Sequence, residues 1–475
     1  MKKSDKSFDR ARAARLLGPV LLGAVLWFAP HTAAIQPAAW HMFALFTATI
    51  LALILAPMPI GAIAILALTV VLVTGLVPLK EALYGFGNAT IWLIVIAFFI
   101  SRGFIKTGLG QRIAYHFVRL FGKHTLTLSY ALLGCDLVLA PATPSNTARA
   151  GGILYPIVRS LAESFGSSPA DHTEKKMGSF LIYTAFQGNL ITAAMFMTAM
   201  AGNPLAVTLA AGMGVHISWM TWFVAALVPG ILSLVLVPLI IYKIYPPEIK
   251  ETPEAGKIAR DKLAEMGPLS PAERRMLFCF AAVLILWILG SSIGLDATIT
   301  AFIGLSLLLL LEVIDWEDVK AEKSAWNTLI WFSVLIMMAT QLNSLGFIPW
   351  FSQAVAGAVH GLSWPLVLLI LVLVYFYSHY IFASATAHVS AMYGAFLGVA
   401  LAAGVPAVPA ALILGYVGSL MGSTTHYGAG PAPILFGSGY VPQNRWWAVN
   451  FLLSLVYLAI WLGVGLVYWH GIGLY

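Results

Sequence analysis

The amino-acid sequence predicts an all-α polytopic membrane protein with about 11 transmembrane helices and two re-entrant hairpins. Apolar residues make up 60% of the 475-residue chain and charged residues only 9%, whereas soluble domains carry about 25% charged residues. The mean hydropathy is +0.89, and 15 Trp and 17 Tyr can serve as interface anchors. The formal charge of +7 lies in short basic clusters beside apolar runs, which is typical of positive-inside topology rather than of a nucleic-acid partner.

The first predicted unit, residues 1–38, holds a cytoplasmic N-terminus and a first span at 16–30. Basic residues favour the cytoplasmic side, and six of them precede this span: Lys2, Lys3, Lys6, Arg10, Arg12 and Arg15. A cleaved signal peptide is the alternative, because small residues at 32–34 follow a short apolar run. Ten further spans make a separate export signal unnecessary, so we expect this segment to remain uncleaved as the first span.

The other predicted spans are runs of about 20 apolar residues. In the first half they are 39–57, 59–78, 89–105, 178–201 and 217–242, and in the second half 276–294, 296–313, 327–345, 391–422 and 446–470, of which 391–422 could be broken. Regions 125–165 and 362–390 are interrupted by Pro or by Ser, Thr and Asn. We predict re-entrant hairpins there, since irregular backbone is allowed at membrane depth only inside protein or beside a water-filled cavity.

Two structural repeats are predicted on either side of a mixed-charge linker at residues 243–275. Two different motifs recur at the same offset of 239 residues: Asn88 with Trp92 recurs as Asn327 with Trp331, and Ser145-Asn146-Thr147 recurs as Ser384-Ala385-Thr386. We therefore predict repeats at 39–242 and 276–475, and an odd number of crossings in each would turn the second upside down. Six crossings after a cytoplasmic N-terminus place the linker in the cytoplasm, in agreement with its Lys and Arg content.

The two Ser-x-Thr motifs are candidate anion-binding sites. Ser145, Asn146 and Thr147 in the first motif, and Ser384 and Thr386 in the second, can donate hydrogen bonds to a carboxylate. A helix that starts at such a motif adds free backbone N–H groups and a partial positive charge. The alternative is that each serine only caps a helix in a loop, but the second copy of the motif favours binding.

Two further segments, 198–204 and 422–433, are rich in helix-breaking residues inside apolar surroundings and lie late in the two halves. Paired interruptions of this kind indicate the central site of a secondary transporter. The alternative is an ordinary kink or turn, which suits the first segment better than the second. The second segment also contains the polar residues Thr424, Thr425 and His426.

Few charges are available in the apolar regions to hold an anion. Arg445 is the only Asp, Glu, Lys or Arg after Ser324, and residues 177–242 contain none. An anionic substrate would therefore be held mainly by neutral dipoles, with Arg149, His388 and His426 as candidates for charge compensation, because ionisable groups within a membrane usually have a function. The alternatives are an ion pair of Arg149 with Asp136 and, for His388, a hydrogen-bonded core histidine.

The segments Thr143–Gly152, Phe382–His388 and Tyr427–Ile434 resemble the divalent anion/sodium symporter family, in its citrate, tartrate and 2-oxoglutarate/malate exchanger branch. The resemblance implies a homodimer in which each protomer has a scaffold domain and a moving transport domain. It also implies that the carboxylates are contacted by Asn146, Thr147, Ser384 and Thr386 from the hairpins, and by Asn203, Gly430 and Pro431 from the broken spans.

The chain departs from the symporters at Ala385, where they have Asn, and this removes a carbonyl oxygen that could bind a hard cation. Sodium is therefore possible as a coupling ion but not favoured. We expect a secondary transporter that exchanges di- or tricarboxylates (malate, succinate, 2-oxoglutarate, tartrate or citrate) across the bacterial inner membrane by an elevator-type mechanism. Its expected partners are carboxylate anions, the lipid bilayer and a second copy of the chain.

Two alternatives remain. One is a sodium- or proton-coupled symporter in which Asp136 or His426 carries the proton. The other is a membrane enzyme acting on a lipid-linked substrate, but the scattered histidines form no nucleophile–base pair or metal triad in the sequence. The two cysteines, Cys135 and Cys279, lie in apolar runs and exclude a disulfide framework and a Cys-rich metal site. We therefore expect no catalytic residues, no metal and no cofactor.

Overall fold

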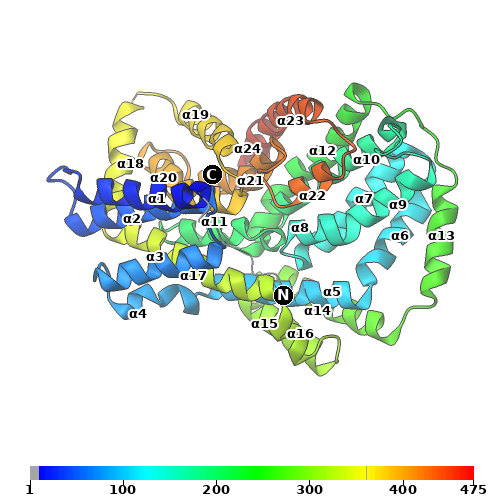
Figure 1. The fold of residues 1–475 in the computed structure, drawn as a ribbon, viewed down its shortest axis with the longest axis horizontal. Helices are drawn as coiled ribbons and strands as arrows, with labels where there is room; N and C mark the ends of the chain where they lie inside the picture. Colours follow the sequence, from blue (N-terminus) through cyan, green and yellow to red (C-terminus); the bar gives the residue numbers. More distant parts are fainter. Residues whose placement is uncertain (1–9, 360) are drawn as a thin grey trace.

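The computed structural model describes residues 10–359 and 361–475, and these residues are almost entirely helical (Figure 1). Their only β-type pairing is an isolated bridge between His124 and Glu251. Eight described helices are long and apolar enough to cross a membrane, and four shorter apolar helices accompany them. The predicted all-α polytopic fold is confirmed, while Lys2, Lys3 and Lys6, on which the placement of the N-terminus rests, lie outside the described residues.

The first half begins with α1 and continues through a hairpin and a broken helix to α12. Its elements are α1 (Arg10–Phe28), α2 (Pro37–Leu55), α3 (Ile60–Val73), α4 (Leu79–Ala82), η1 (Tyr84–Gly87), α5 (Ala89–Thr107), α6 (Leu109–Phe121), α7 (Thr125–Leu139), η2 (Ala140–Ala142), α8 (Asn146–Arg149), the π-helical η3 (Ala150–Leu154), α9 (Tyr155–Ser164), η4 (Glu174–Lys176), α10 (Gly178–Met195), η5 (Met197–Ala199), α11 (Gly202–Ala211) and α12 (Trp219–Ile244).

The second half follows the linker helix α13 (Ala255–Met266) and presents its elements in the same order. They are α14 (Pro271–Ile293), α15 (Ala297–Leu310), α16 (Trp316–Ala321), α17 (Lys323–Ser344), α18 (Phe347–Ala358), α19 (Trp364–Tyr377), η6 (Ser378–Ile381), α20 (Ala385–Ala402), α21 (Ala407–Leu420), η7 (Met421–Ser423), α22 (Pro431–Gly437), α23 (Gln443–Leu458), the π-helical η8 (Ala459–Val464) and α24 (Gly465–Gly471). In both halves a hairpin (α7 to α9, or α19 to α20) precedes a broken helix (α10–α11, or α21–α22).

One predicted boundary is wrong. The sequence placed a hairpin at 362–390 and a span at 391–422, but α20 continues to Ala402 and the next helix starts at Ala407. The helix ends there because Gly404 adopts a left-handed conformation (φ +78°) and Val405 N–H turns back to the carbonyl of Ala400 at 2.9 Å, a glycine-based helix end. The second hairpin is therefore longer than predicted, and the broken span is 407–437.

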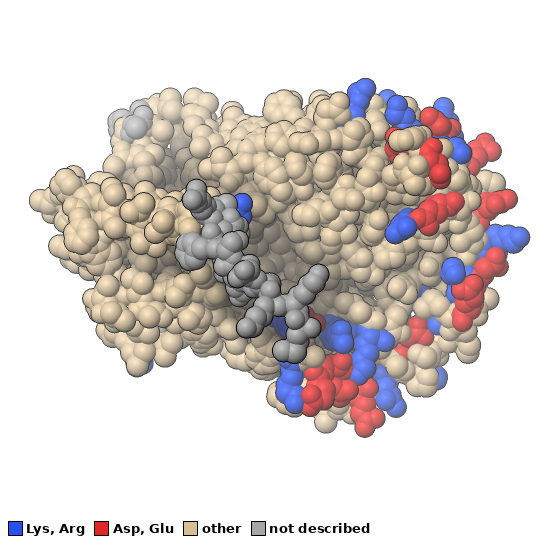
Figure 2. Space-filling model, in the orientation of Figure 1, with Lys and Arg blue, Asp and Glu red and all other residues tan. Residues whose placement is uncertain are grey.

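The charged side chains are unevenly distributed over the molecule. Figure 2 shows Lys, Arg, Asp and Glu gathered toward one end, over α9, α13 and the surroundings of α16, while the part over α2, α3 and α18 carries few charges. The linker packs against this charged end, since Thr252 donates to the carbonyl of Gly122 at 2.8 Å. Arg112 on α6 forms a buried ion pair with Glu273 at 2.6 Å, which joins α6 to the start of α14.

The predicted topology can be tested with single cysteines, because both native cysteines are buried and should give little background. Lys257 in the linker and Gly471 at the end of α24 are exposed. We expect Lys257→Cys to react only with membrane-permeant maleimides and Gly471→Cys to react with impermeant ones from outside, since an odd number of crossings separates an N-terminus inside from a C-terminus outside. Labelling of both positions from the same side would contradict the eleven-span topology.

Candidate functional site

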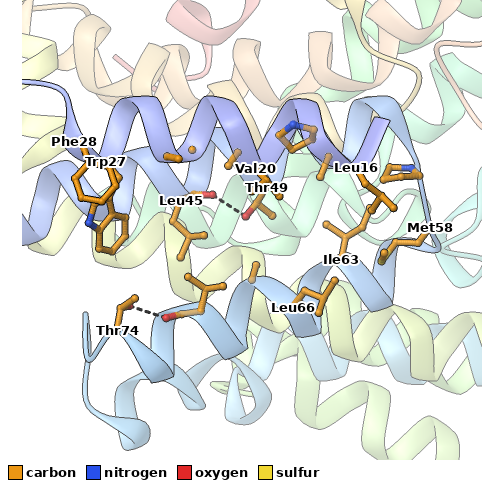
Figure 3. A pocket seen from close by; sticks show the side chains of 18 residues that line it. Leu16, Val20, Trp27, Phe28, Leu45, Thr49, Met58, Ile63, Leu66 and Thr74 are labelled. Atoms are coloured by element: carbon orange, nitrogen blue, oxygen red, sulfur yellow. Dashed lines mark hydrogen bonds between the residues drawn. The ribbon is translucent and has the colours of Figure 1, made fainter. Parts of the chain in front are cut away.

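An apolar groove of about 410 Å³ lies between α1, α2 and α3 (Figure 3). Leu16, Val20, Leu45 and Leu66 point into it. The hydroxyl of Thr49, also in the lining, donates back to the carbonyl of Leu45 at 2.8 Å, so it offers no hydrogen bond to a ligand. The groove therefore lacks the chemistry to bind an anion.

A second cavity, of about 210 Å³, lies where the two hairpins meet the two broken helices. Six of the eight residues predicted to contact substrate line it: Ser145, Asn146, Thr147, Ser384, Thr386 and Gly430. Residues 239 positions apart in the sequence thus share one cavity. No Asp, Glu, Lys or Arg is among the described residues that line it.

Local helix geometry orients the two motifs. Ser145 caps α8, its hydroxyl oxygen accepting from the N–H of Ala148 at 3.1 Å, and Ser384 caps α20 by accepting from the N–H of Ala387 at 3.3 Å. The capping role considered from the sequence is therefore real. It does not compete with binding, because a hydroxyl that accepts at a cap keeps its own proton to donate.

The side chains that follow each cap are available to a ligand. In the part of the chain that the structure describes, the amide of Asn146 and the hydroxyls of Thr147 and Thr386 have no protein hydrogen-bond partner. Asn146 is 8% exposed, so its free amide is held against the cavity rather than in bulk solvent. These three groups can supply hydrogen bonds to an anion without first breaking others.

The N-termini of helices from both halves also converge on this cavity. The helical run that starts at Asn146 continues through η3 and α9 to Ser164, and α20 runs 18 residues from Ala385. Ala201, just before α11, and Gly430, just before α22, complete the arrangement. Helix N-termini carry partial positive charge and unpaired N–H groups, so the cavity is positive without containing a charged side chain.

Some lining residues were missed by the sequence reasoning. Thr328 and Trp331 come from α17, Phe98 comes from α5, and Ser419 comes from α21. Trp331 belongs to the Asn-x-x-x-Trp repeat, which served only to measure the offset between the halves. The repeat was thus a usable signal for Trp331. Thr328 occupies a position of the same repeat that differs between the two copies, and Phe98 and Ser419 belong to no motif.

Two predicted contact residues do not line the cavity. Asn203 is buried, and its amide donates to the carbonyls of Ala193 at 2.7 Å and Phe196 at 2.9 Å, so it satisfies the backbone exposed by the break after α10. Pro431 is the first residue of α22. Both shape the broken helices without facing the cavity.

Arg149 is neutralised within the protein, as in the alternative considered from the sequence. Its guanidinium is fully buried and pairs with Asp136 at 3.0 Å, and it also donates to the carbonyls of Thr143 and, at 3.0 Å, Ala199. Asn189 donates to Asp136 as well, at 3.2 Å. The prediction that Arg149 compensates the charge of a substrate is therefore wrong. Its ion pair is neutral and connects the first hairpin to η5.

The two candidate histidines also lie away from the cavity lining. His426 is half-buried, and its Nδ1 accepts from Nε1 of Trp447 at 3.0 Å. His388 is fully buried and contacts a second histidine, His379, which the sequence analysis did not single out. Neither histidine is therefore placed to contact a carboxylate in the cavity.

A comparison with protein families matches residues 10–475 to the sodium:sulfate symporter transmembrane region. The chain belongs to this family. The predicted membership of the divalent anion/sodium symporters is therefore confirmed, and the chain is a member of a family of multi-pass membrane transporters. Its bacterial relatives agree with the predicted inner-membrane location.

Several relatives cover nearly the whole chain. A putative malate transporter, YflS, of Bacillus subtilis is 56% identical over 99% of this chain and 100% of its own length. The chloroplastic dicarboxylate transporter 1 of Spinacia oleracea is 48% identical over 97% of this chain and 81% of its own. An L-tartrate/succinate antiporter of Shigella boydii is 36% identical over 96% of this chain and 97% of its own.

Among solved structures, the YdaH transporter of Alcanivorax borkumensis has a similar fold. Its TM-score is 0.54 at 14% identity, with 98% of this chain and 97% of that chain covered. At this identity the likeness concerns the fold alone.

Gly430 offers a direct test of the cavity within this family member. A Cβ at this position would fall on the hydroxyl of Thr147, whereas at Gly437, at the end of the same helix α22, a Cβ meets nothing within 4 Å. We expect Gly430→Ala to abolish transport by purified protein in liposomes and Gly437→Ala to retain it. Equal activity of the two variants would rule out this cavity as the substrate site.

The Arg149–Asp136 pair predicts a stability effect. Arg149→Gln leaves the Asp136 carboxylate buried without its cation, which costs about 3–5 kcal/mol for buried pairs. Thermal unfolding in detergent should show a lower midpoint for Arg149→Gln and for Asp136→Asn, with partial recovery in the double variant. A double variant as unstable as the sum of the two single changes would show that the pair does not act as a unit.

Proposed function

We propose that the chain is a secondary transporter that exchanges dicarboxylates across the membrane without sodium. The observation that carries the proposal is the uncharged cavity in which helix N-termini and free Asn and Thr side chains converge from both halves. Such a site favours anions through dipoles that hold no counter-ion. The relatives whose names specify malate, dicarboxylates, or tartrate and succinate support the same substrate class.

The duplicated motif suits a substrate with two carboxylates. Asn146 and Thr147 lie on one hairpin and Thr386 lies on the other, so each carboxylate can be given its own donors. Pockets for drug-sized ligands measure about 300–1,000 Å³, and the cavity of about 210 Å³ suits a smaller metabolite. Neutral donors do not measure chain length, so several short dicarboxylates should compete for one site.

The cavity also suits alternating access. It lies between the spans α5 and α17, which supply Phe98, Thr328 and Trp331, and the hairpins and broken helices on its other side. A substrate bound there is held between two groups of elements that could move past each other. We propose an elevator motion of the hairpins and broken helices against the spans, within a homodimer.

The absence of sodium coupling is supported by Ala385, which lines the cavity where symporters have Asn. The methyl group supplies no oxygen to a hard cation. The charge of a dicarboxylate is then offset by helix dipoles, while Arg149 keeps the first hairpin in place through Asp136.

Removal of single donors should weaken binding. Hydrogen bonds to charged groups contribute about 1.5–3 kcal/mol, so Asn146→Ala and Thr386→Ala should each reduce malate affinity about tenfold to more than a hundredfold. The exposed residues Asn444 and Thr69 supply matched controls, Asn444→Ala and Thr69→Ala, which should bind malate as the wild type does. Radiolabelled malate binding to purified protein measures the effect, and unchanged affinity in both site variants would exclude these donors.

Exchange can be separated from symport in proteoliposomes loaded with malate. With sodium replaced by choline on both sides, external malate should still drive release of labelled internal malate, whereas release into malate-free buffer should be much slower. Transport that stops in choline would show sodium coupling instead. Absence of any dicarboxylate transport would contradict the proposed function itself.

A further inference from the structure

Two buried histidines meet within the second hairpin. His379 lies in η6 and His388 lies in α20, and both are fully buried. Their Nδ1 atoms are 3.1 Å apart, and the ring planes lie within 8° of each other with centroids 5.2 Å apart. The nearly coplanar rings therefore face each other edge to edge, so one nitrogen must carry a proton and the other a lone pair.

The pair is the centre of a chain of four hydrogen-bonding contacts. Nε2 of His379 lies 2.8 Å from the carbonyl of Gly428, and Nε2 of His388 lies 3.2 Å from the hydroxyl of Ser378. That hydroxyl also lies 2.9 Å from the carbonyl of Tyr375. The chain thus links the second hairpin to the loop of the broken helix that leads to Gly430.

The four contacts need one proton more than neutral side chains supply. Two neutral imidazoles and one hydroxyl carry three polar protons between them. If Ser378 donates to Tyr375, then His388 must donate to Ser378 and His379 must donate to His388. The remaining nitrogen of His379 then faces the Gly428 carbonyl, and two acceptors would meet there unless this nitrogen is also protonated.

We propose that His379 and His388 together form a proton-binding site, and that this site takes up a proton when a dicarboxylate enters the cavity. The inference rests on the proposed function, which supplies the anion. In the neutral state Ser378 donates to His388, His388 to His379, and His379 to Gly428, at the expense of the contact with Tyr375. The added proton restores all four contacts.

The aromatic rings beside the pair offset part of the cost of burying a positive charge there. His388 lies against the face of Phe382, with centroids 4.5 Å apart and planes within 10°, and against Tyr375 at 4.7 Å. An aromatic ring attracts a cation that lies over its face, most strongly where water is excluded. Among the described residues no carboxylate pairs with either histidine. The polar groups within hydrogen-bonding distance of the pair are the Ser378 hydroxyl and the Gly428 carbonyl, and Tyr375 is the titratable side chain whose ring packs against it.

The position of the pair explains why the proton and the anion should bind together. Thr386 and Gly430 line the cavity. His388 follows Thr386 by two residues, and Gly428 precedes Gly430 by two residues. A buried charge without a partner is costly, so the proton binds weakly to the empty transporter. A dicarboxylate in the cavity lowers that cost, and the proton strengthens anion binding to the same extent, because coupling between two binding sites is reciprocal.

Calorimetry of malate binding tests the inference, since titrations in buffers of different ionisation enthalpy count the protons taken up. We expect the wild type to take up close to one proton per malate near pH 7. Its malate affinity should then fall about tenfold for each unit of increasing pH, over the range in which the histidine pair is neutral in the empty protein and protonated in the complex. His379→Gln, whose amide can still donate to Gly428, should bind malate with nearly no proton uptake. His426→Gln, which changes the other histidine near the site, should keep the uptake.

A second variant retains both imidazoles, so that loss of folding cannot be mistaken for loss of the proton site. At Gly428 a Cβ would lie 2.7 Å from Nε2 of His379, so Gly428→Ala should displace that ring and reduce proton uptake. Gly437→Ala is its control, since it has free space. Binding of malate without proton uptake, or unchanged uptake in His379→Gln, would refute this inference alone. Absence of binding by every dicarboxylate would refute the proposed function and this inference with it.

Discussion

The interior of this protein depends on how the backbone groups exposed by broken helices are satisfied. Water is scarce at membrane depth, so each unpaired carbonyl or N–H is costly. Buried side chains pair with the carbonyls at three breaks: Arg149 with Thr143 and Ala199, Asn203 with Ala193 and Phe196, and His379 with Gly428. The helix N-termini that start after the breaks are left to face the cavity, and the proposed preference of the site for anions rests on this division.

The ionisable groups near the site differ in what they can contribute. Arg149 is paired with Asp136 at 3.0 Å, and the two charges cancel whether or not a substrate is present. His388 lies against the aromatic rings of Tyr375 and Phe382, and among the described residues no carboxylate pairs with it or with His379. A permanent ion pair can only hold the first hairpin in place, whereas a group without a fixed counter-charge can respond to an anion.

The length of apolar runs predicted most spans, and their interruptions predicted both hairpins, because both signals are local in the sequence. The shared offset predicted that Ser145 and Ser384 would be equivalent, and both cap helices at one cavity. The predicted end of the second hairpin was wrong, because Gly404 lies in a continuous apolar stretch and its left-handed conformation cannot be read from that stretch. The sequence offered Asp136 as a partner of Arg149, but the contacts of Arg149 with Ala199 and of His379 with Gly428, 50 and 49 residues away, depend on packing between distant segments, which no local pattern records.

A cavity lined by helix N-termini offers a reason why the transport site of an exchanger would cross the membrane with an anion bound in both directions. The dipoles of the empty site point into a space without a counter-ion, and moving such a site through a low-dielectric layer leaves their field uncompensated. In the proposed exchange a bound dicarboxylate would cancel that field, so the loaded site would cross more easily than the empty one. A proton on the histidine pair would bring the complex still closer to neutrality. The same dipoles that select the substrate would thereby make the return of the empty carrier slow, with no need for a separate gate.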